Sequence, residues 1–218
     1  MADDADTSPQ LKIALFESLR RQLSGEGFEL NAPRDKFLRR HDGISDSFQL
    51  ACKDAKPGYR VQPNVGVRID RGEEIFHRTS GFDREFQDNT STMGAPVGAL
   101  VGANARDCEF LLESDSEIPD VTGKLVKVFR DVALPYYAKW KSLQAIDADL
   151  NADPARRTPH RGLAWFRCST GLIVAKLEGR PDYESLADIY SDIMTKDNKG
   201  FYLKRFEALR ASLESMKI

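Results

Sequence analysis

The sequence predicts an α+β protein with an N-terminal helix, an antiparallel β-meander of about four to five strands and a C-terminal bundle of about five helices. Two observations lead to this fold class. Residues 36–69 alternate apolar and polar side chains, which is typical of half-buried strands. From residue 116 onward, apolar side chains recur every three or four positions, as in amphipathic helices. Strands that come first and helices that follow favour an α+β arrangement over an alternating α/β fold.

The first element is a helix expected from about Pro9 to Ser24, because its apolar residues fall on one helical face and Pro9 suits a first turn. Gly25 then ends it. Residues 1–8 form an acidic tail, which we predict to be disordered. The apolar face is made by Leu11, Leu15, Phe16, Leu19 and Leu23.

The meander follows. The segments Lys36–His41 and Ile44–Cys52 are separated by Asp42-Gly43, a favoured two-residue hairpin turn. The run Tyr59–Ile69 has the clearest alternation of the chain. It contains Pro63, which cannot donate to a strand ladder, so we expect an edge strand or a bulge there.

A short helix is expected at Glu73–Arg78, and further strands at Pro96–Ala103 and Cys108–Leu112. We divide the chain into residues 9–115, which hold the first helix and the sheet, and residues 116–218, which pack on them in one compact unit. No Pro/Gly/Ser-rich linker separates the two parts. The five expected helices are one from Ile118 to a break at Pro135, one ending near Asn151, one at His160–Glu178 interrupted at Gly171, one starting at Pro181, and one beginning near Tyr202, with an αα-hairpin around Lys199-Gly200.

Composition excludes several classes of protein. The 218 residues are 41% hydrophobic and 30% charged with a net charge of −2, which is ordinary for a globular protein and argues against a generally basic nucleic-acid binder. No window approaches the roughly 20 apolar residues of a membrane helix, and the acidic N-terminus does not resemble a signal peptide. Three widely spaced cysteines argue against a disulfide framework. We therefore expect a cytoplasmic protein that binds neither a membrane nor a specific nucleic acid.

Motifs for catalysis are missing from the sequence. Thr122-Gly123-Lys124 lacks the upstream glycine of a phosphate-binding loop, and no dinucleotide fingerprint or Gly-x-Ser-x-Gly elbow occurs. Glu73 and His77, four residues apart, could share one helix face and bind a divalent ion weakly with a third ligand, but such a pair is more often a surface ion pair or helix contact. We therefore predict neither a metal nor a cofactor. Cys52 and Cys168 lie among apolar residues and are expected to be core thiols.

Charge segregation is the one unusual feature. Between positions 156 and 180 there are six basic residues and one acidic residue, a local charge of +5. One interpretation is that these charges are solvated and attracted to acidic stretches of the same fold. The other is a basic face at Arg156, Arg157 and Arg161 that binds an acidic protein partner. On this basis the leading hypothesis is a non-enzymatic binding or interaction protein.

Two alternatives remain open. The first is a small-molecule enzyme, a hydrolase or transferase, with its site between the sheet and the helices. Its polar wall would comprise Arg39, His41, Arg60 and Arg68. The second is a homo-oligomer that buries an aromatic cluster around Tyr136, Tyr137 and Trp140. The sequence identifies neither a substrate nor an oligomeric state.

Four short motifs support a resemblance: Gly27-Phe28, Phe37-Leu38-Arg39, Leu134-Pro135-Tyr136 and the stretch 175–183. With the order of elements, they resemble an uncharacterised bacterial domain-of-unknown-function family. The similarity spans most of the chain. It implies a bacterial cytosolic α+β protein and brings no catalytic residues. By analogy alone, such proteins act as immunity-type or accessory binding proteins.

Overall fold

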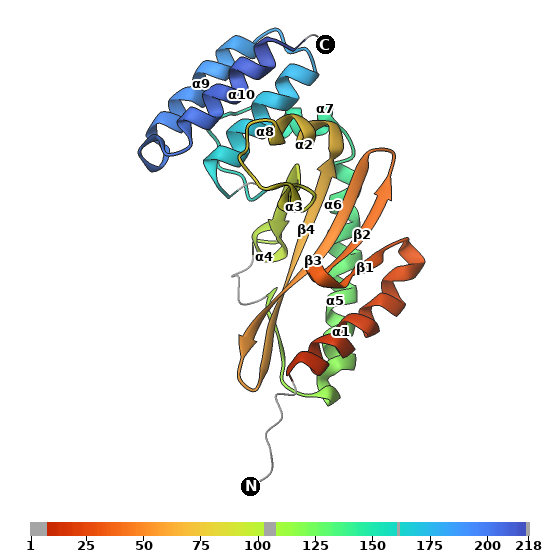
Figure 1. Ribbon diagram of the computed structural model, residues 1–218. Coiled ribbons are helices and arrows are strands. Elements are labelled where there is room, and N and C mark those ends of the chain that lie inside the picture. Colours follow the sequence, from red (N-terminus) through yellow and green to blue (C-terminus); the bar gives the residue numbers. More distant parts are fainter. Residues whose placement is uncertain (1–7, 103–107, 161, 217–218) are drawn as a thin grey trace. The chain divides into compact units, whose positions relative to one another are not determined.

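The structure is a computed structural model that describes residues 8–102, 108–160 and 162–216. It confirms the predicted α+β class, with an N-terminal helix, an antiparallel sheet and C-terminal helices (Figure 1). The predicted disorder of residues 1–8 falls almost wholly outside the described residues, since helix α1 (Ser8–Leu23) begins at the last of them.

Within the described residues, the sheet has six strands in the order β1-β2-β3-β4-β5, and β6 pairs with β4 as well. The pairs β1·β2 and β4·β6 are antiparallel, with Glu29 opposite Leu38 and Tyr59 opposite Leu112. The strands are β1 (Glu29–Asn31), β2 (Lys36–His41), β3 (Ile44–Ala55), β4 (Gly58–Ile69), β5 (Met93–Pro96) and β6 (Phe110–Leu112).

The predicted hairpin between β2 and β3 is confirmed. Asp42 and Gly43 both have positive φ, at 45° and 73°, which is the backbone of a type I′ turn. This turn matches the right-handed twist of the strands on either side of it.

Of the two alternatives predicted at Pro63, an edge strand or a bulge, the burial pattern excludes the bulge. Residues at odd positions of β4 are buried from Tyr59 to Ile69, and Pro63 keeps this phase. A bulge adds a residue and would have moved the apolar side chains to the other face. Pro63 lies beyond Val61, the last β4 residue in the β6 register, so its missing N–H is not required there.

The strand predicted at Pro96–Ala103 is also wrong in its position. The strand β5 ends at Pro96, and α4 (Val97–Leu100) follows it as a single helical turn. Proline fixes a backbone angle that suits the start of a helix, so it marks the switch between the two elements.

The chain divides into two compact units. The first unit comprises residues up to His41 together with Ser45–Gly66 and Ala95–Ala138, and the second comprises Asp42–Ile44, Val67–Gly94 and residues from Lys139 onward. The predicted division into residues 9–115 and 116–218, packed in one compact unit, stays a prediction.

In the first unit, α1 packs on α5 (Ile118–Val128). A π-helical turn at Phe129–Ala133 leads from α5 directly into α6 (Leu134–Lys139). The break predicted at Pro135 is therefore wrong. A π-turn disturbs the regular hydrogen-bond pattern, so a proline just after it removes little.

The helices of the second unit begin with α2 (Asp70–His77), close to the helix predicted at Glu73–Arg78, and with the short α3 (Arg84–Gln87). Ser142 caps α7 by accepting the N–H of Ala145 at 3.2 Å. The later helices are α7 (Leu143–Leu150), α8 (Ala164–Leu177), α9 (Tyr183–Lys196) and α10 (Leu203–Glu214).

Helix α8 is the centre of this unit and contacts α2, α7, α9 and α10. The predicted interruption at Gly171 is wrong, because α8 runs through it. A side chain at this position would meet the hydroxyl of Tyr190 from α9, so the glycine permits close packing of the two helices.

Candidate interaction site

The basic segment predicted from the sequence is largely engaged within the fold. Arg156 forms an ion pair with Asp149 at 3.1 Å. Arg167 is buried and donates to the backbone carbonyls of Leu150 at 3.3 Å and Asp153 at 3.0 Å. Its guanidinium therefore ties the end of α7 to α8 and does not face a partner.

The same is true further along the segment. Arg180 pairs with Asp147 at 3.0 Å and with Asp182 at 2.7 Å. The Lys176 ammonium lies 5.0 Å from the centre of the Tyr183 ring, which is a cation–π contact. These contacts favour the interpretation that acidic stretches of the same chain satisfy the local charge.

Little of the predicted face is left. Arg161 lies outside the described residues. Arg157 is exposed, and among the described residues it has no ion pair. Of the three proposed positions, only Arg157 presents a guanidinium that is both described and unpaired.

Another basic surface lies at the turn between α9 and α10. Between residues 196 and 205 there are four basic residues and one acidic residue, a local charge of +3. In the described part of the chain, Lys196, Lys199 and Lys204 have no ion pair or side-chain hydrogen bond. We call residues 196–205 the hairpin tip.

An unusual backbone presents an aromatic residue at this tip. Asn198, Lys199 and Gly200 all have positive φ, at 43°, 54° and 74°. Two of the three are not glycine, and such conformations cost energy that the surrounding structure must supply. Phe201 follows directly and is 71% exposed, the highest value among the large hydrophobic residues described.

Phe201 packs against the aromatic rings of Tyr202 and, through it, Trp165. Its ring meets that of Tyr202 edge-on at 4.8 Å, and Tyr202 lies parallel to Trp165 with 4.7 Å between ring centres. Arg205 lies 5.7 Å from the Trp165 ring and donates to the carbonyl of Ser80 at 3.1 Å. Tyr202 and Arg205 are therefore fixed, and Phe201 projects from an ordered base.

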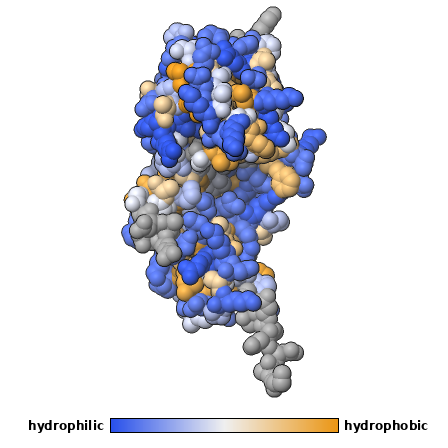
Figure 2. Space-filling model, turned by 90° about the vertical axis from the view of Figure 1, so that its left-hand side faces the viewer, coloured by the Kyte–Doolittle hydropathy of each residue, from blue (hydrophilic) through white to orange (hydrophobic). Residues whose placement is uncertain are grey.

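The two helices behind the tip are held together as well. Arg210 of α10 reaches Asp188 at 2.9 Å and Glu184 at 3.3 Å, both on α9. Phe206 and Leu209 are buried in the core of the second unit. Figure 2 shows the helical part of the surface as mostly hydrophilic, with apolar patches between the hydrophilic areas.

The predicted polar wall is only partly assembled. Arg39 and His41 come together on one carboxylate: Oδ2 of Asp46 accepts from Nε and Nη2 of Arg39 at 3.0 and 2.7 Å and lies 3.1 Å from Nε2 of His41. Asp46 is 1% exposed. Sequence reasoning missed this residue.

A signal for Asp46 was present in the sequence. Asp46 has the same phase as Phe48 and Leu50 on β3, so the alternation places it on the buried face. The two-residue turn at Asp42-Gly43 sets residue 39 opposite residue 46. Register and phase together therefore point to a buried pair of Arg39 and Asp46.

Aromatic groups enclose this cluster. The Arg39 guanidinium lies over the rings of Phe28 at 4.8 Å and Tyr137 at 6.0 Å. Burial raises the pKa of the Tyr137 hydroxyl well above its usual range, and this hydroxyl donates to the carbonyl of Ser47 at 2.8 Å. In the described residues, no serine, threonine or cysteine side chain bonds to His41, so the cluster lacks an activated nucleophile.

The other two residues of the predicted wall have different surroundings. Arg60 is exposed on β4 and lies opposite Leu111 of β6. Arg68 donates to Asp70 at 2.9 Å and to Thr90 Oγ1 at 3.0 Å. Neither residue contacts the carboxylate of Asp46.

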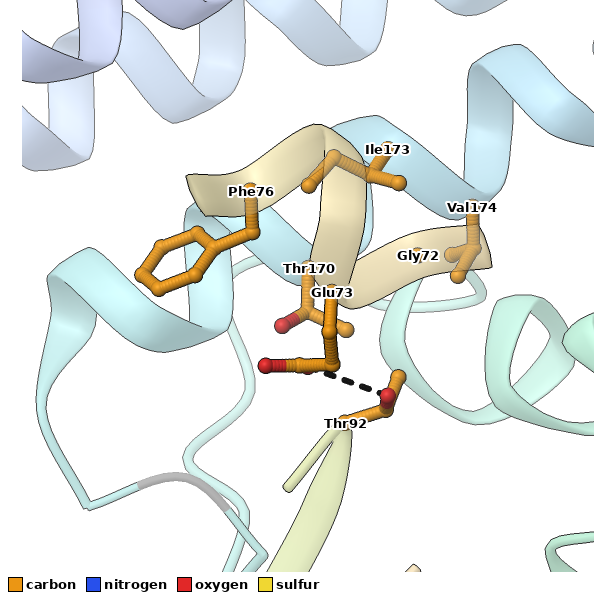
Figure 3. A pocket seen from close by; sticks show the side chains of 7 residues that line it. All are labelled: Gly72, Glu73, Phe76, Thr92, Thr170, Ile173 and Val174. Carbon is orange, nitrogen blue, oxygen red and sulfur yellow. Dashed lines mark hydrogen bonds between the residues drawn. The ribbon is translucent and has the colours of Figure 1, made fainter. Parts of the chain in front are cut away.

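Arg68 belongs to a buried polar network around Glu73. The Glu73 carboxylate accepts from Thr92 Oγ1 at 3.0 Å and from Thr90 Oγ1 at 2.5 Å (Figure 3 shows Glu73 and Thr92). Nε2 of His77 lies 2.8 Å from Thr90 Oγ1. Because Thr90 gives its proton to Glu73, His77 donates to Thr90 from Nε2, as a neutral imidazole can.

This network stabilises the fold and leaves no space for a ligand. The pocket beside Glu73 is lined also by Phe76, Thr170 and Ile173 (Figure 3). These side chains fill it and leave about 0 Å³ for a water molecule or a ligand. The Thr90 hydroxyl lies between the predicted Glu73–His77 pair. Among the described residues, no group of three or more His, Cys, Asp or Glu side chains is arranged to hold a metal ion.

Cys168 and the predicted aromatic cluster are buried, whereas Cys52, predicted as a core thiol, is only partly buried. Tyr136, Tyr137 and Trp140, predicted as an oligomer surface, belong to the core, so this prediction is wrong as to their exposure. Burial raises the pKa of Cys168 to about 12 and that of Cys52 to about 11, which keeps both thiols protonated at neutral pH.

Comparisons of the chain with known protein families, with curated proteins and with solved structures find no match. The resemblance to an uncharacterised bacterial family therefore stays a prediction beyond its α+β architecture. Across the described ranges, no helix combines the length and the apolar character needed to cross a membrane.

Proposed function

We propose that this chain is a non-enzymatic interaction protein that binds an acidic segment of a protein partner at the hairpin tip. The observation that carries this proposal is the exposed Phe201 among three unpaired lysines. Aromatic residues on a rigid support are the anchors that interfaces favour, because little conformational entropy is lost when they are buried. The surrounding lysines would steer an acidic partner and select it over a basic one.

The backbone of the tip supports the same proposal. A turn with three consecutive residues of positive φ is costly, and a simple helix connection does not require it. Here the turn places Phe201 in solvent and leaves its neighbours to stack on Trp165. Strain kept next to an exposed aromatic is typical of binding sites.

The test uses two labelled peptides of equal length, each with the same two tryptophans. The two peptides differ only at their charged positions, which are glutamates in one peptide and lysines in the other. Fluorescence anisotropy should show binding of the acidic peptide alone, with an affinity that falls as salt is raised. We expect Phe201→Ser to weaken binding at least fivefold, and Lys199→Glu with Lys204→Glu to abolish it.

Matched controls separate this site from the basic face predicted from the sequence. Ile189→Ser removes a partly exposed apolar side chain of α9 that lies outside the hairpin tip. This variant should bind the acidic peptide within twofold of the wild-type affinity. The triple variant Arg156→Glu, Arg157→Glu and Arg161→Glu tests the predicted face. Loss of binding in the triple variant, with binding retained in Phe201→Ser, would move the site to that face and contradict the proposal.

A small-molecule enzyme is the second candidate function. It is favoured by one observation, the contact between the half-exposed His41 and the buried Asp46 at 3.1 Å. A carboxylate of this kind orients an imidazole that acts as a general base. Arg39 occupies the same carboxylate oxygen with two hydrogen bonds, so this oxygen is not reserved for the imidazole, and the binding proposal has the stronger support. Hydrolysis of a panel of ester and phosphoester substrates that is lost in His41→Gln would reverse this order.

A further inference from the structure

A groove of about 380 Å³ lies in the first unit, between α1, β1, β4 and the segment after β1. Its apolar walls are formed by Ile13, Phe16, Leu30 and Tyr59. Ile13 is 63% exposed at the lip, so an apolar surface is open to solvent here. The volume falls in the range of small-molecule sites, which are mostly apolar with a few fixed polar groups.

The polar groups of the groove are Lys12, Glu17 and Asp35. Nζ of Lys12 lies 2.6 Å from Oδ2 of Asp35, and both side chains are about one-third exposed. Burial works against the charged form of Lys12, but the hydrogen bond and the charge of Asp35 outweigh it, so the pKa of Lys12 is raised. At neutral pH the Lys12 ammonium is therefore charged and lies against the Asp35 carboxylate.

Glu17 adds the third charge. It pairs with Arg20 at 2.8 Å, but both side chains are about half exposed, and such surface pairs contribute little. Two carboxylates and one ammonium therefore face the groove. The excess negative charge lies beside the aromatic rings of Phe16 and Tyr59, whose faces also attract cations.

We propose that this groove binds a small molecule with a protonated amine at one end and an apolar tail. The tail would lie against Ile13, Phe16 and Leu30. The amine would replace Arg20 as the ion-pair partner of Glu17. It would also bind the carboxylate of Asp35, which Lys12 already contacts. The site belongs to the first unit and the hairpin tip to the second, so each inference stands or fails by itself.

The groove is a binding site and not a reaction centre. Cys52 interacts electrostatically with Lys12 but does not line the groove. Burial raises the pKa of Cys52 to about 11, so the thiol is not ionised at neutral pH. Binding without turnover is the expected behaviour.

The test uses three probes with the same tail: 4-phenylbutylamine, 4-phenylbutyrate and 4-phenylbutanol. Calorimetric titration of the full chain should give the amine a Kd on the order of 1 mM or tighter, with the acid at least tenfold weaker and the alcohol between them. Chemical-shift changes should map to Ile13 and Leu30. Tighter binding of the acid than of the amine would overturn the proposal. So would the absence of amine binding at a concentration about tenfold above the expected Kd.

Variants assign the charges. Glu17→Gln, at a half-exposed position, should weaken amine binding several-fold without affecting the alcohol. Asp35→Asn frees Lys12 and should reverse the preference toward the acid. Ala32→Phe fills the groove and should abolish binding of all three probes, whereas Ala155→Phe, at an exposed alanine of the second unit, should change none. Equal amine affinity in Glu17→Gln, Asp35→Asn and the wild type would contradict the proposed role of the carboxylates.

Discussion

The guanidinium of Arg39 holds the buried carboxylate of Asp46 through two hydrogen bonds, at 3.0 and 2.7 Å. Removal of one partner of a buried pair leaves an uncompensated charge, which is strongly destabilising. His41 still contacts Asp46 and the Arg39 side chain is 30% exposed, which limits the loss. We expect Arg39→Leu to lower the free energy of unfolding by about 2–3 kcal/mol, measured by urea denaturation.

Arg40 provides the control for this change. It is the next residue on β2 and is exposed. Surface substitutions of this kind change stability by about 0.5 kcal/mol or less. If Arg40→Leu and Arg39→Leu were equally destabilising, the loss would come from the strand and not from the pair with Asp46.

The same pair shows what the sequence was able to predict. The alternation along β3 and the turn at Asp42-Gly43 are local signals, and together they define both the buried phase and the register of residues 39 and 46. The fold class and most helix limits rest on similar short-range patterns. Alternation alone does not reveal Asp46, because a charged residue in an apolar phase indicates a buried pair only when the strand register is considered with it.

The rest depended on contacts that are distant in sequence. Arg180 is neutralised by Asp147, 33 residues away, so a count of local charge cannot tell whether it faces a partner or the fold itself. Gly171 looked like a helix breaker because the constraint on it, the Tyr190 side chain, comes from another helix. The hairpin tip was predicted as a turn, but nothing local indicated that Phe201 would be exposed while Tyr202 stacks on Trp165.

The close packing at Gly171 leads to a second prediction. A methyl group there would overlap the Tyr190 hydroxyl and lie 3.0 Å from Oδ1 of Asn151, both of which are buried and hydrogen-bonded to each other. Overpacking of a dense core costs about 1–3 kcal/mol. Gly171→Ala should therefore lower the midpoint of thermal unfolding by several degrees.

Gly123 is the matched control, because it lies inside α5 with nothing within 4 Å of the added methyl group. Alanine has the higher helix propensity, so Gly123→Ala should stabilise the protein by up to about 1 kcal/mol. Opposite signs at the two positions are the expected result. Stabilisation by both substitutions would show that α8 and α9 can separate to admit the methyl group.

A third prediction concerns Arg167, which sequence counting had assigned to the basic segment. Its guanidinium satisfies the carbonyls of Leu150 and Asp153 at the end of α7. Substitution by leucine fills the space but leaves these acceptors without a donor, at a cost of about 1–3 kcal/mol. Arg167→Leu should reduce stability without changing affinity for the acidic peptide, whereas Lys199→Glu should do the reverse. If folded Arg167→Leu lost affinity for the acidic peptide, Arg167 would take part in binding, and its purely structural role would be contradicted.

The last prediction is a pH dependence of stability that arises from His77. Burial lowers the pKa of this imidazole, and it outweighs the opposing effect of the Glu73 charge. The ordinary pKa of a histidine side chain is about 6.5. The folded protein therefore keeps His77 neutral at pH values where the same side chain binds a proton in the unfolded chain. Since the unfolded state then holds more protons, stability is fully present above about pH 6.5 and falls as the pH drops below it, by up to about 1.4 kcal/mol per pH unit and per histidine.

Burial lowers the pKa of His160 as well, so both histidines contribute to the decline. Urea denaturation at pH 7.5, 6.5 and 5.5 should show a shallower decline for His77→Gln than for the wild type, and the shallowest for His77→Gln combined with His160→Gln. The slope is the readout, because the loss of the hydrogen bonds to Thr90 and Ser80 lowers stability equally at every pH. An unchanged slope in His77→Gln would mean that His77 is protonated as readily in the folded as in the unfolded chain, and that the network around Glu73 accepts an imidazolium.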